Sequence, residues 1–200
     1  CDVPSHWYSF SFAPNPNWSH KYSYGPEIQA YMEKTAADFD VTSVCRFNTS
    51  VETLDYVDGK WQLVTQHGDE EIFDIIISAT GILHHPSRPD IAGLESFEGQ
   101  CFHSAEWNMD AHLDGKRVGI IGTGSTSAQI VGAITDRVAK MDVFQRTPHW
   151  VAPLPQRAYS KFERFMMRLL PFLPRMIYWA NYTQFKMVFG PATTGNKWAQ

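Results

Sequence analysis

Cysteine is scarce in this sequence, and its few cysteines form no metal-binding pattern. Cys1, Cys45 and Cys101 are the only three among 200 residues. Their odd number and wide spacing exclude a disulfide framework and a zinc motif. We therefore expect reduced thiols, no metal site and a cytoplasmic protein, because reducing compartments keep cysteines unpaired.

An excess of positive charge is also missing. The formal net charge is -4, and the acidic residues are scattered along the chain instead of forming a tail. A chain of this kind has no broad cationic field that could attract a polyanion. Nucleic acid is therefore excluded as an expected partner.

Long hydrophobic runs are absent as well. The most apolar stretch, residues 165–189, is interrupted by Arg168, Pro171, Pro174, Arg175 and Lys186 before about 18 uninterrupted apolar residues accumulate. It predicts core or interface helices, with a peripheral membrane contact through residues 165–189 as the alternative. The sequence also lacks an initiator methionine and a signal-peptide pattern, so we interpret it as an internal fragment of a longer protein.

The first half of the chain predicts one helix and a β-meander. Apolar or small residues recur at helical spacing over residues 26–39, where Pro26 suits a first turn. Two β-rich runs, residues 51–57 and 61–65, flank Asp58-Gly59, a dipeptide typical of tight hairpins. A third run, residues 72–79, holds three successive isoleucines and predicts a strand covered on both faces.

The second half predicts a parallel crossover unit. Prolines and a glycine in residues 84–93 indicate a connector between two lobes. A strand over 117–121, a helix over 125–138 and a strand over 141–147 then follow in the order of an α/β fold. Beyond them, Ser160 and Glu163 have the spacing of a capping box, which predicts a helical tail.

A glycine-rich turn joins the first strand of this unit to its helix. Its residues form the pattern GxGxxS, in which one glycine permits the tight turn and the next lets the backbone approach a pyrophosphate. Free amides at the start of the helix favour negative charge. The bare pattern also fits an ordinary turn, but its context favours a dinucleotide site made by Gly122, Thr123, Gly124, Ser125, Thr126 and Ser127.

The end of the second strand indicates which dinucleotide binds. Arg146 and Thr147 occupy the position where an NAD-binding unit would carry an acidic residue. A guanidinium can form paired bonds to a ribose 2′-phosphate, and a hydroxyl can add another. Asp142 has the spacing of an NAD-type acid, about 20 residues after the glycines, but it opens the strand instead of ending it. The sequence therefore predicts NADPH.

A further motif precedes this unit and carries a family resemblance. Residues Phe97, Gly99, His103 and Trp107 form the pattern FxGxxxHxxxW. This resembles the fingerprint of type I Baeyer-Villiger monooxygenases, which in that family lies just before the NADPH-binding Rossmann unit. Related N- and S-oxygenating enzymes tend to have another aromatic residue at the last position, so Trp107 favours the Baeyer-Villiger branch.

The resemblance implies a fold and a division of the chain. The fold is α/β, part of a flavoprotein with two dinucleotide-binding domains that combines a Rossmann-type NADPH unit with the β-meander of the FAD domain. Residues 1–82 are similar to the end of the first FAD-binding segment, and residues 83–115 to the connector with the fingerprint. Residues 116–150 resemble the NADPH unit, and residues 151–200 the start of a helical insertion. Ala79-Thr80-Gly81 is similar to the family's linker motif, and residues 145–148 to its phosphate clamp.

The resemblance also implies site residues. Asp2 matches the family's active-site aspartate, Tyr8 resembles a residue beside the flavin, and Val51 falls where the backbone meets the FAD adenine. His103 is either a catalytic residue or a structural residue at the junction of the lobes, and the structural interpretation is favoured. The family's FAD-binding GxGxxG would precede Asp2, and its catalytic arginine would follow Gln200.

Three functions follow from these observations. The leading expectation is an FAD- and NADPH-dependent monooxygenase that inserts one oxygen atom from O2 into a ketone, giving an ester or lactone, with the fragment inactive alone. The alternatives are an N- or S-oxygenating flavin monooxygenase and a non-catalytic NADP-binding regulatory module. The sequence leaves the substrate and the oligomeric state open.

Overall fold

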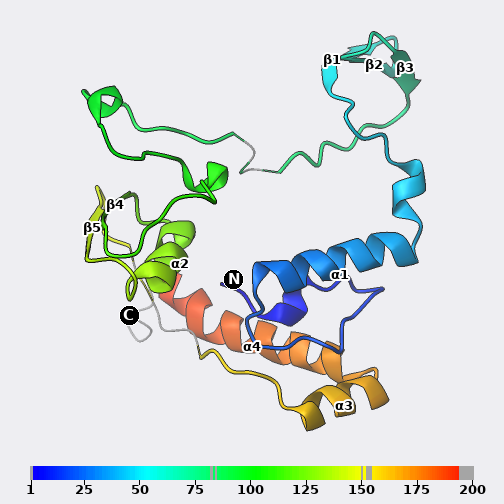
Figure 1. The fold of residues 1–200 in the computed structure, drawn as a ribbon. Helices are drawn as coiled ribbons and strands as arrows, with labels where there is room; N and C mark the ends of the chain where they lie inside the picture. The colour runs from blue at the N-terminus through cyan, green and yellow to red at the C-terminus, as the bar shows by residue number, and fades with distance from the viewer. Residues whose placement is uncertain (1, 82, 84, 150, 152–154, 194–200) are drawn as a thin grey trace. The chain divides into compact units, whose positions relative to one another are not determined.

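The computed structural model of the chain describes residues 2–81, 83, 85–149, 151 and 155–193. By their internal contacts these residues divide into two units, and Figure 1 labels the helices and strands of both. Of the described residues, those within 1–43, 123–129 and 146–200 form the first unit, and those within 44–122 and 130–145 form the second. The N-terminal and C-terminal segments of the chain therefore belong to the same unit.

Helices build the first unit. A short 3-10 helix, η1 (Ser5–Tyr8), precedes α1 (Gly25–Asp38), which has Pro26 in its first turn. α3 (Lys161–Leu169) begins with a capping box: the Ser160 hydroxyl accepts from the Glu163 amide at 3.1 Å, and the Glu163 carboxylate accepts from the Ser160 amide at 2.8 Å. α4 (Leu173–Thr193) follows. The helix expected over residues 26–39 and the helical tail are confirmed.

The core of the first unit joins segments that lie far apart in the sequence. It contains one residue from the loop before α1, one from α1, one from the segment before α3 and one from α3: Trp18, Tyr31, Tyr159 and Met167. Beside this cluster, His20 and Ala158 form an antiparallel bridge. The core thus holds the N-terminal loop, α1 and α3 together.

Two buried serines fix η1 to the segment before α1. Ser5 and Ser23 are both fully buried. The Ser5 hydroxyl lies 2.7 Å from the carbonyl oxygen of His20, and it accepts from the Ser23 amide at 2.7 Å. The Ser5 amide also donates to the Lys21 carbonyl at 2.8 Å. Because the hydroxyl and amide groups of Ser5 and the amide of Ser23 all form hydrogen bonds, they can be buried here at little cost.

His6 makes the stability of the first unit depend on pH. It is 2% exposed, and its Nε2 has no hydrogen-bond partner among the described residues. Burial lowers the pKa of His6 to about 4, so as the pH falls below the ordinary histidine value the unfolded chain takes up the proton first. We expect the free energy of unfolding to fall between pH 6.5 and about pH 4, by at most about 1.4 kcal/mol per pH unit.

Urea unfolding measured across this pH range checks the expectation. The control is His6→Phe, which keeps an aromatic ring beside Tyr159 but has no proton to gain. This variant should lose less stability on acidification than the wild type. Equal slopes in the two proteins would contradict the role given to His6.

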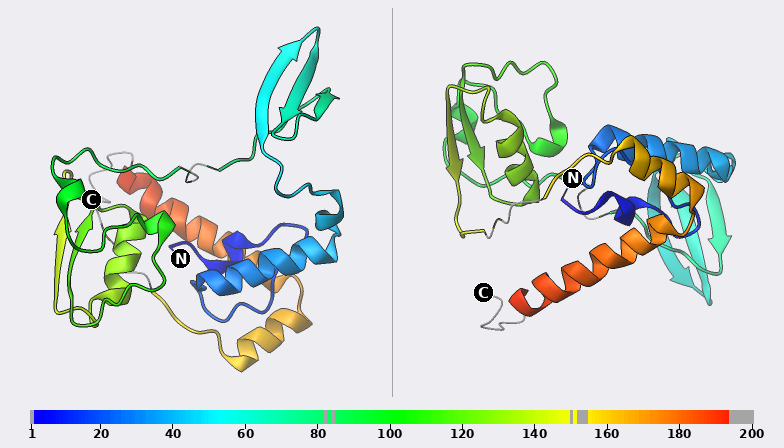
Figure 2. Two further views of the ribbon diagram at one scale, coloured as in Figure 1. Left: turned by 45° about the horizontal axis from the view of Figure 1, so that its top comes forward. Right: turned by 90° about the horizontal axis from the view of Figure 1, so that it is seen from below.

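An antiparallel meander dominates the first part of the second unit. β1 (Val51–Val57), β2 (Lys60–Thr65) and β3 (Glu70–Phe73) pair in that order, and Figure 2 shows the three strands, in cyan and green-cyan, as one twisted sheet. At the first turn Val57 pairs with Lys60, and Asp58 and Gly59 have φ values of 50° and 80°. Positive φ at both central residues is the conformation that the Asp-Gly pair predicted, so the hairpin is confirmed.

The third strand differs from the prediction. A strand covered on both faces was expected over residues 72–79, but β3 ends at Phe73. Ile75 and Ile77 are 76% and 85% exposed. β2 pairs with residues 70–73 and no further, so within the described residues no neighbouring strand continues past Phe73. The run of isoleucines predicted a strand between two neighbours, but no described strand pairs with residues 75–77.

A parallel strand pair forms the second part. β4 (Arg117–Ile121) pairs with β5 (Lys140–Phe144) in parallel, and α2 (Ser125–Ile134) connects them. The expected order of strand, helix and parallel strand is therefore confirmed. α2 ends at Ile134, four residues before the predicted end of the helix, and residues 135–137 form a turn.

Neither α3 nor α4 has the character of a membrane-spanning helix. Among the described residues, no helix combines the length and the apolar content needed to cross a bilayer. Met167 of α3 lies in the core, as expected for a core helix, and Leu173 and Ile177 of α4 pack against that core. A peripheral membrane contact through residues 165–189 stays a prediction.

Candidate dinucleotide-binding site

The glycine-rich loop leaves the end of β4 in a conformation that favours glycine. Gly122 has a φ of 107°, a value that side chains with a Cβ rarely adopt. Its amide donates to the carbonyl of Phe144 at 2.9 Å, which fixes the start of the loop to the end of β5. Gly122 is thus required by backbone geometry, as the sequence predicted.

The loop runs directly into α2. The Ala128 amide donates to the Gly124 carbonyl at 3.1 Å, so the three amides before Ala128 have no helical acceptor. These are the amides of Ser125, Thr126 and Ser127. A Cβ built on Gly124 would meet no heavy atom within 4 Å, so open space lies beside the backbone there. Free amides and open space both fit a bound diphosphate.

The predicted phosphate clamp follows the end of β5. Ile121 and Phe144 are paired at the end of the two strands, and Arg146 and Thr147 lie two and three residues further along the chain. Both are exposed, and no ion pair of Arg146 is found in the described part of the chain. An exposed guanidinium after this strand is available to an anionic ligand.

Asp142 is engaged elsewhere. The predicted strand began at residue 141, whereas β5 begins at Lys140, so Asp142 lies in the middle of the strand. There it pairs in register with Gly119. Its carboxylate forms an ion pair with Lys140 at 3.0 Å. It therefore does not lie at the strand end, where a ribose-binding acid is expected.

The FxGxxxHxxxW segment is held together by local contacts. The His103 Nδ1 accepts from the Ala105 amide at 3.0 Å and so caps the 3-10 helix η4 (Ser104–Glu106). Trp107 meets the ring of Phe102 edge-on, with 5.1 Å between ring centroids. A Cβ on Gly99 would lie 2.5 Å from the ring of Phe97, so a larger residue would displace that ring. The hydrogen bond of His103 is local to this segment, and its role at the junction of the lobes stays a prediction.

The residues assigned to the flavin side lie in both units. In the first unit, Asp2 is exposed and Tyr8 is half-buried against the core. The pKa of Tyr8 is raised by burial and, to a smaller extent, by the charge of Asp2. In the second unit, Val51 opens β1 and pairs with Thr65. Their roles toward a flavin stay predictions, as do the four domain boundaries.

The sequence did not reveal a cavity in the first unit. Lys21 and Arg157 line it together with residues of α3 and α4. The capping box at Ser160 and Glu163 was visible as a local pattern, but Lys21 and Arg157 stand in loops without periodicity. No spacing in the sequence connects them.

Comparison with known proteins places the chain in a family. Residues 5–187 match the family model described as flavin-binding monooxygenase-like. A Baeyer-Villiger monooxygenase of Streptomyces coelicolor is 46% identical over 173 residues, which is 86% of this chain and 33% of that protein. The chain spans about a third of the length of the curated relatives it matches.

Solved structures agree with this match. A cyclohexanone monooxygenase from Rhodococcus sp. Phi1 bound to NADP+ is 34% identical, with a TM-score of 0.73 over 84% of this chain and 33% of that one. A structure of OTEMO in complex with FAD and NADP is 35% identical, with a TM-score of 0.75 over 84% and 34% of the two chains. The α/β fold class expected from the sequence is confirmed, and the chain belongs to the flavin-binding monooxygenase-like family.

Proposed function

We propose that the chain is the NADPH-binding part of an FAD- and NADPH-dependent monooxygenase of the Baeyer-Villiger type. The full protein would insert one oxygen atom from O2 into a ketone, giving an ester or lactone. The observation that carries the proposal is the loop after β4, where Gly122 has a positive φ and the α2 amides are free, combined with Arg146 after β5. Relatives named as Baeyer-Villiger monooxygenases support the reaction type.

Each part of the chain has a distinct task in this proposal. The amides of Ser125, Thr126 and Ser127 would bind the pyrophosphate of NADPH, and Arg146 with Thr147 would bind its 2′-phosphate. Asp2, Tyr8 and Val51 would belong to the FAD side. The bound flavin supplies the oxygen-transfer chemistry, while the protein holds the nicotinamide cofactor in place and excludes water.

Substrate-dependent oxidation of NADPH by the full-length flavoprotein tests the proposal. A cyclic ketone should accelerate NADPH oxidation, and the product should be the lactone that contains one atom of labelled dioxygen. Acceleration by an amine or a sulfide instead would favour N- or S-oxygenation. A full-length protein without bound flavin would contradict the proposal and support a regulatory NADP-binding module.

His103 provides a second test, which separates a structural role from a catalytic one. We expect His103→Ala in the full-length enzyme to lower kcat while leaving the FAD content unchanged. The physical reason is the loss of the cap on η4, which typically costs about 0.5–2 kcal/mol and loosens the fingerprint segment.

His103→Asn is the matched control, because asparagine can also accept a hydrogen bond from the Ala105 amide. It should recover much of the turnover lost in His103→Ala. If both variants lose activity equally, or if His103→Ala loses its FAD with the fold intact, the capping role is wrong.

A further inference from the structure

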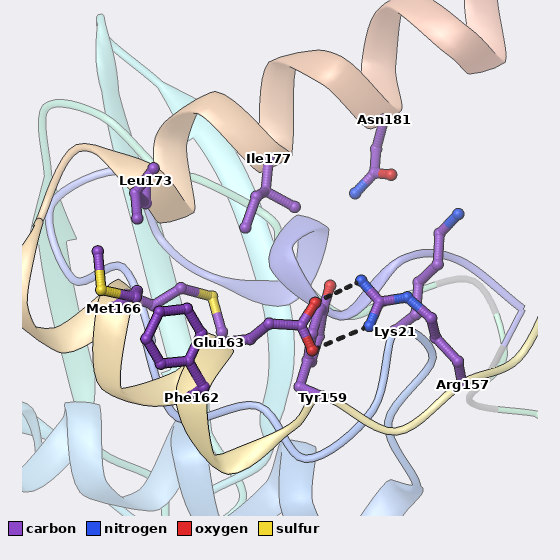
Figure 3. A pocket seen from close by; sticks show the side chains of 10 residues that line it. Lys21, Arg157, Tyr159, Phe162, Glu163, Met166, Leu173, Ile177 and Asn181 are labelled. Carbon is purple, nitrogen blue, oxygen red and sulfur yellow. Dashed lines mark hydrogen bonds and ion pairs between the residues drawn. The ribbon is translucent and has the colours of Figure 1, made fainter.

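The lining of a cavity in the first unit includes none of the residues assigned to the cofactors. Its volume is about 480 Å³, within the range of small-molecule sites. α3 lines one side and α4 another, and the loops that carry Lys21 and Arg157 complete it (Figure 3). None of its lining residues has a role in the proposed monooxygenase reaction.

One end of the cavity is apolar. Phe162 and Met166 of α3 line it from one side, and Leu173 and Ile177 of α4 line it from the other. Figure 3 shows Phe162, Met166 and Leu173 at the opposite end from Lys21 and Arg157, with Ile177 between the two ends. Methionine adapts its flexible side chain to ligands of different shape, so this end suits a hydrocarbon chain.

At the polar end, the single acidic group is already neutralised. The Arg157 guanidinium forms a two-point ion pair with the Glu163 carboxylate, with N–O distances of 2.9 and 3.1 Å. The same carboxylate accepts from the Ser160 amide. These hydrogen bonds, that of Arg157 foremost, lower the pKa of Glu163 to about 2, so at neutral pH the pair is ionic and carries no net charge.

Two further donors at this end have no acceptor in the described part of the chain. The Nδ2 of Asn181 is buried without a hydrogen-bond partner. Lys21 has no ion pair among the described residues, and its ammonium lies 5.7 Å from the centre of the Tyr22 ring. Figure 3 shows both side chains at the end of the cavity where Arg157 lies. An unpaired buried amide is costly, so a ligand acceptor would stabilise this arrangement.

We propose that this cavity binds an amphipathic monocarboxylate, a fatty acid of medium chain length. Its hydrocarbon chain would lie between α3 and α4, and its carboxylate would accept from Lys21 and Asn181. Charge selects this class: the neutral Arg157–Glu163 pair and the Lys21 ammonium together leave one positive charge at the polar end. An amine would meet a like charge there, and a neutral alcohol would leave the ammonium without a counter-ion.

Calorimetric titration of the full-length flavoprotein with decanoate tests the proposal. We expect saturable binding of one decanoate per chain. 1-Decanol, which has the same length but no charge, should bind at least tenfold more weakly, since a charge-assisted hydrogen bond is lost. Hexanoate should also bind at least tenfold more weakly, because it buries fewer methylene groups.

The variants Lys21→Met and Lys161→Met form a matched pair. Lys161 is an exposed lysine at the start of α3 that does not line the cavity. Lys21→Met should weaken decanoate binding roughly tenfold, whereas Lys161→Met should leave it unchanged. Asn181→Leu, which removes the buried donor, should also weaken binding. Unchanged thermal midpoints and FAD content establish that the variants are folded.

Several outcomes would overturn the proposal. One is the absence of saturable decanoate binding, as expected if another segment of the longer polypeptide fills the cavity. Another is equal affinity for decanoate and 1-decanol. Should Lys21→Met fail to fold, the comparison of decanoate with 1-decanol on the wild-type protein still decides the question. Ketone-dependent NADPH oxidation is measured separately, so its loss leaves this test intact.

Discussion

Replacing Arg146 by alanine is expected to raise the Michaelis constant for NADPH roughly 10-fold to 100-fold while leaving that for NADH nearly unchanged. The two cofactors differ at the ribose 2′-position, where NADPH carries a phosphate. Arg146 follows β5 in the chain, is exposed, and has no ion pair in the described residues. Its fork of donors suits a phosphate, so the loss should fall on the cofactor that has one.

Steady-state kinetics of the full-length enzyme with each cofactor measures this effect. Arg117→Ala is the matched control, because Arg117 is an exposed arginine at the opposite end of β4 from the loop. It should change neither Michaelis constant. Arg146→Lys should give an intermediate value for NADPH, since it keeps the charge but loses the fork. Equal increases for NADPH and NADH in Arg146→Ala would exclude a role at the 2′-phosphate.

The features that sequence reasoning predicted are those set by a few neighbouring residues. Asp58 and Gly59 both adopt positive φ in the first hairpin, and Gly122 adopts it at the start of the loop. Ser160 and Glu163 form both hydrogen bonds of the capping box. In each case the chemistry that makes the signal lies within four residues, so one sequence is enough to detect it.

The features that were missed depend on residues far apart in the chain. Ile75 and Ile77 have the composition of a covered strand, but whether a strand is covered depends on a partner elsewhere. The cavity brings Lys21 together with Asn181, which lies 160 positions later. No local sequence pattern predicts that Lys21 and Asn181 line one cavity, because their proximity results from the packing of α3 and α4 against the N-terminal loop.

The stability of the first unit should depend strongly on Trp18, which shares a core cluster with residues far along the chain. We expect Trp18→Ala to lower the free energy of unfolding by about 3–5 kcal/mol, the usual cost of removing a large buried aromatic side chain. The Trp18 side chain is 0% exposed and lies 5.3 Å from the ring of Tyr31, measured between centroids. Its Nε1 donates to the Ser9 hydroxyl at 3.2 Å, so the variant loses a hydrogen bond as well as packing.

Equilibrium urea unfolding compares this variant with Trp179→Ala. Trp179 is the same residue type in α4, but it is 61% exposed and contacts Tyr178 and Tyr182 at the surface. Removing it should cost roughly 1 kcal/mol or less. Trp18 packs beside Met167, which follows it by 149 positions, so the loss at Trp18 should loosen the N-terminal loop and α3 together. If Trp18→Ala and Trp179→Ala lowered the free energy of unfolding by similar amounts, burial of Trp18 would contribute nothing extra. The stabilising role given to this core would then be wrong.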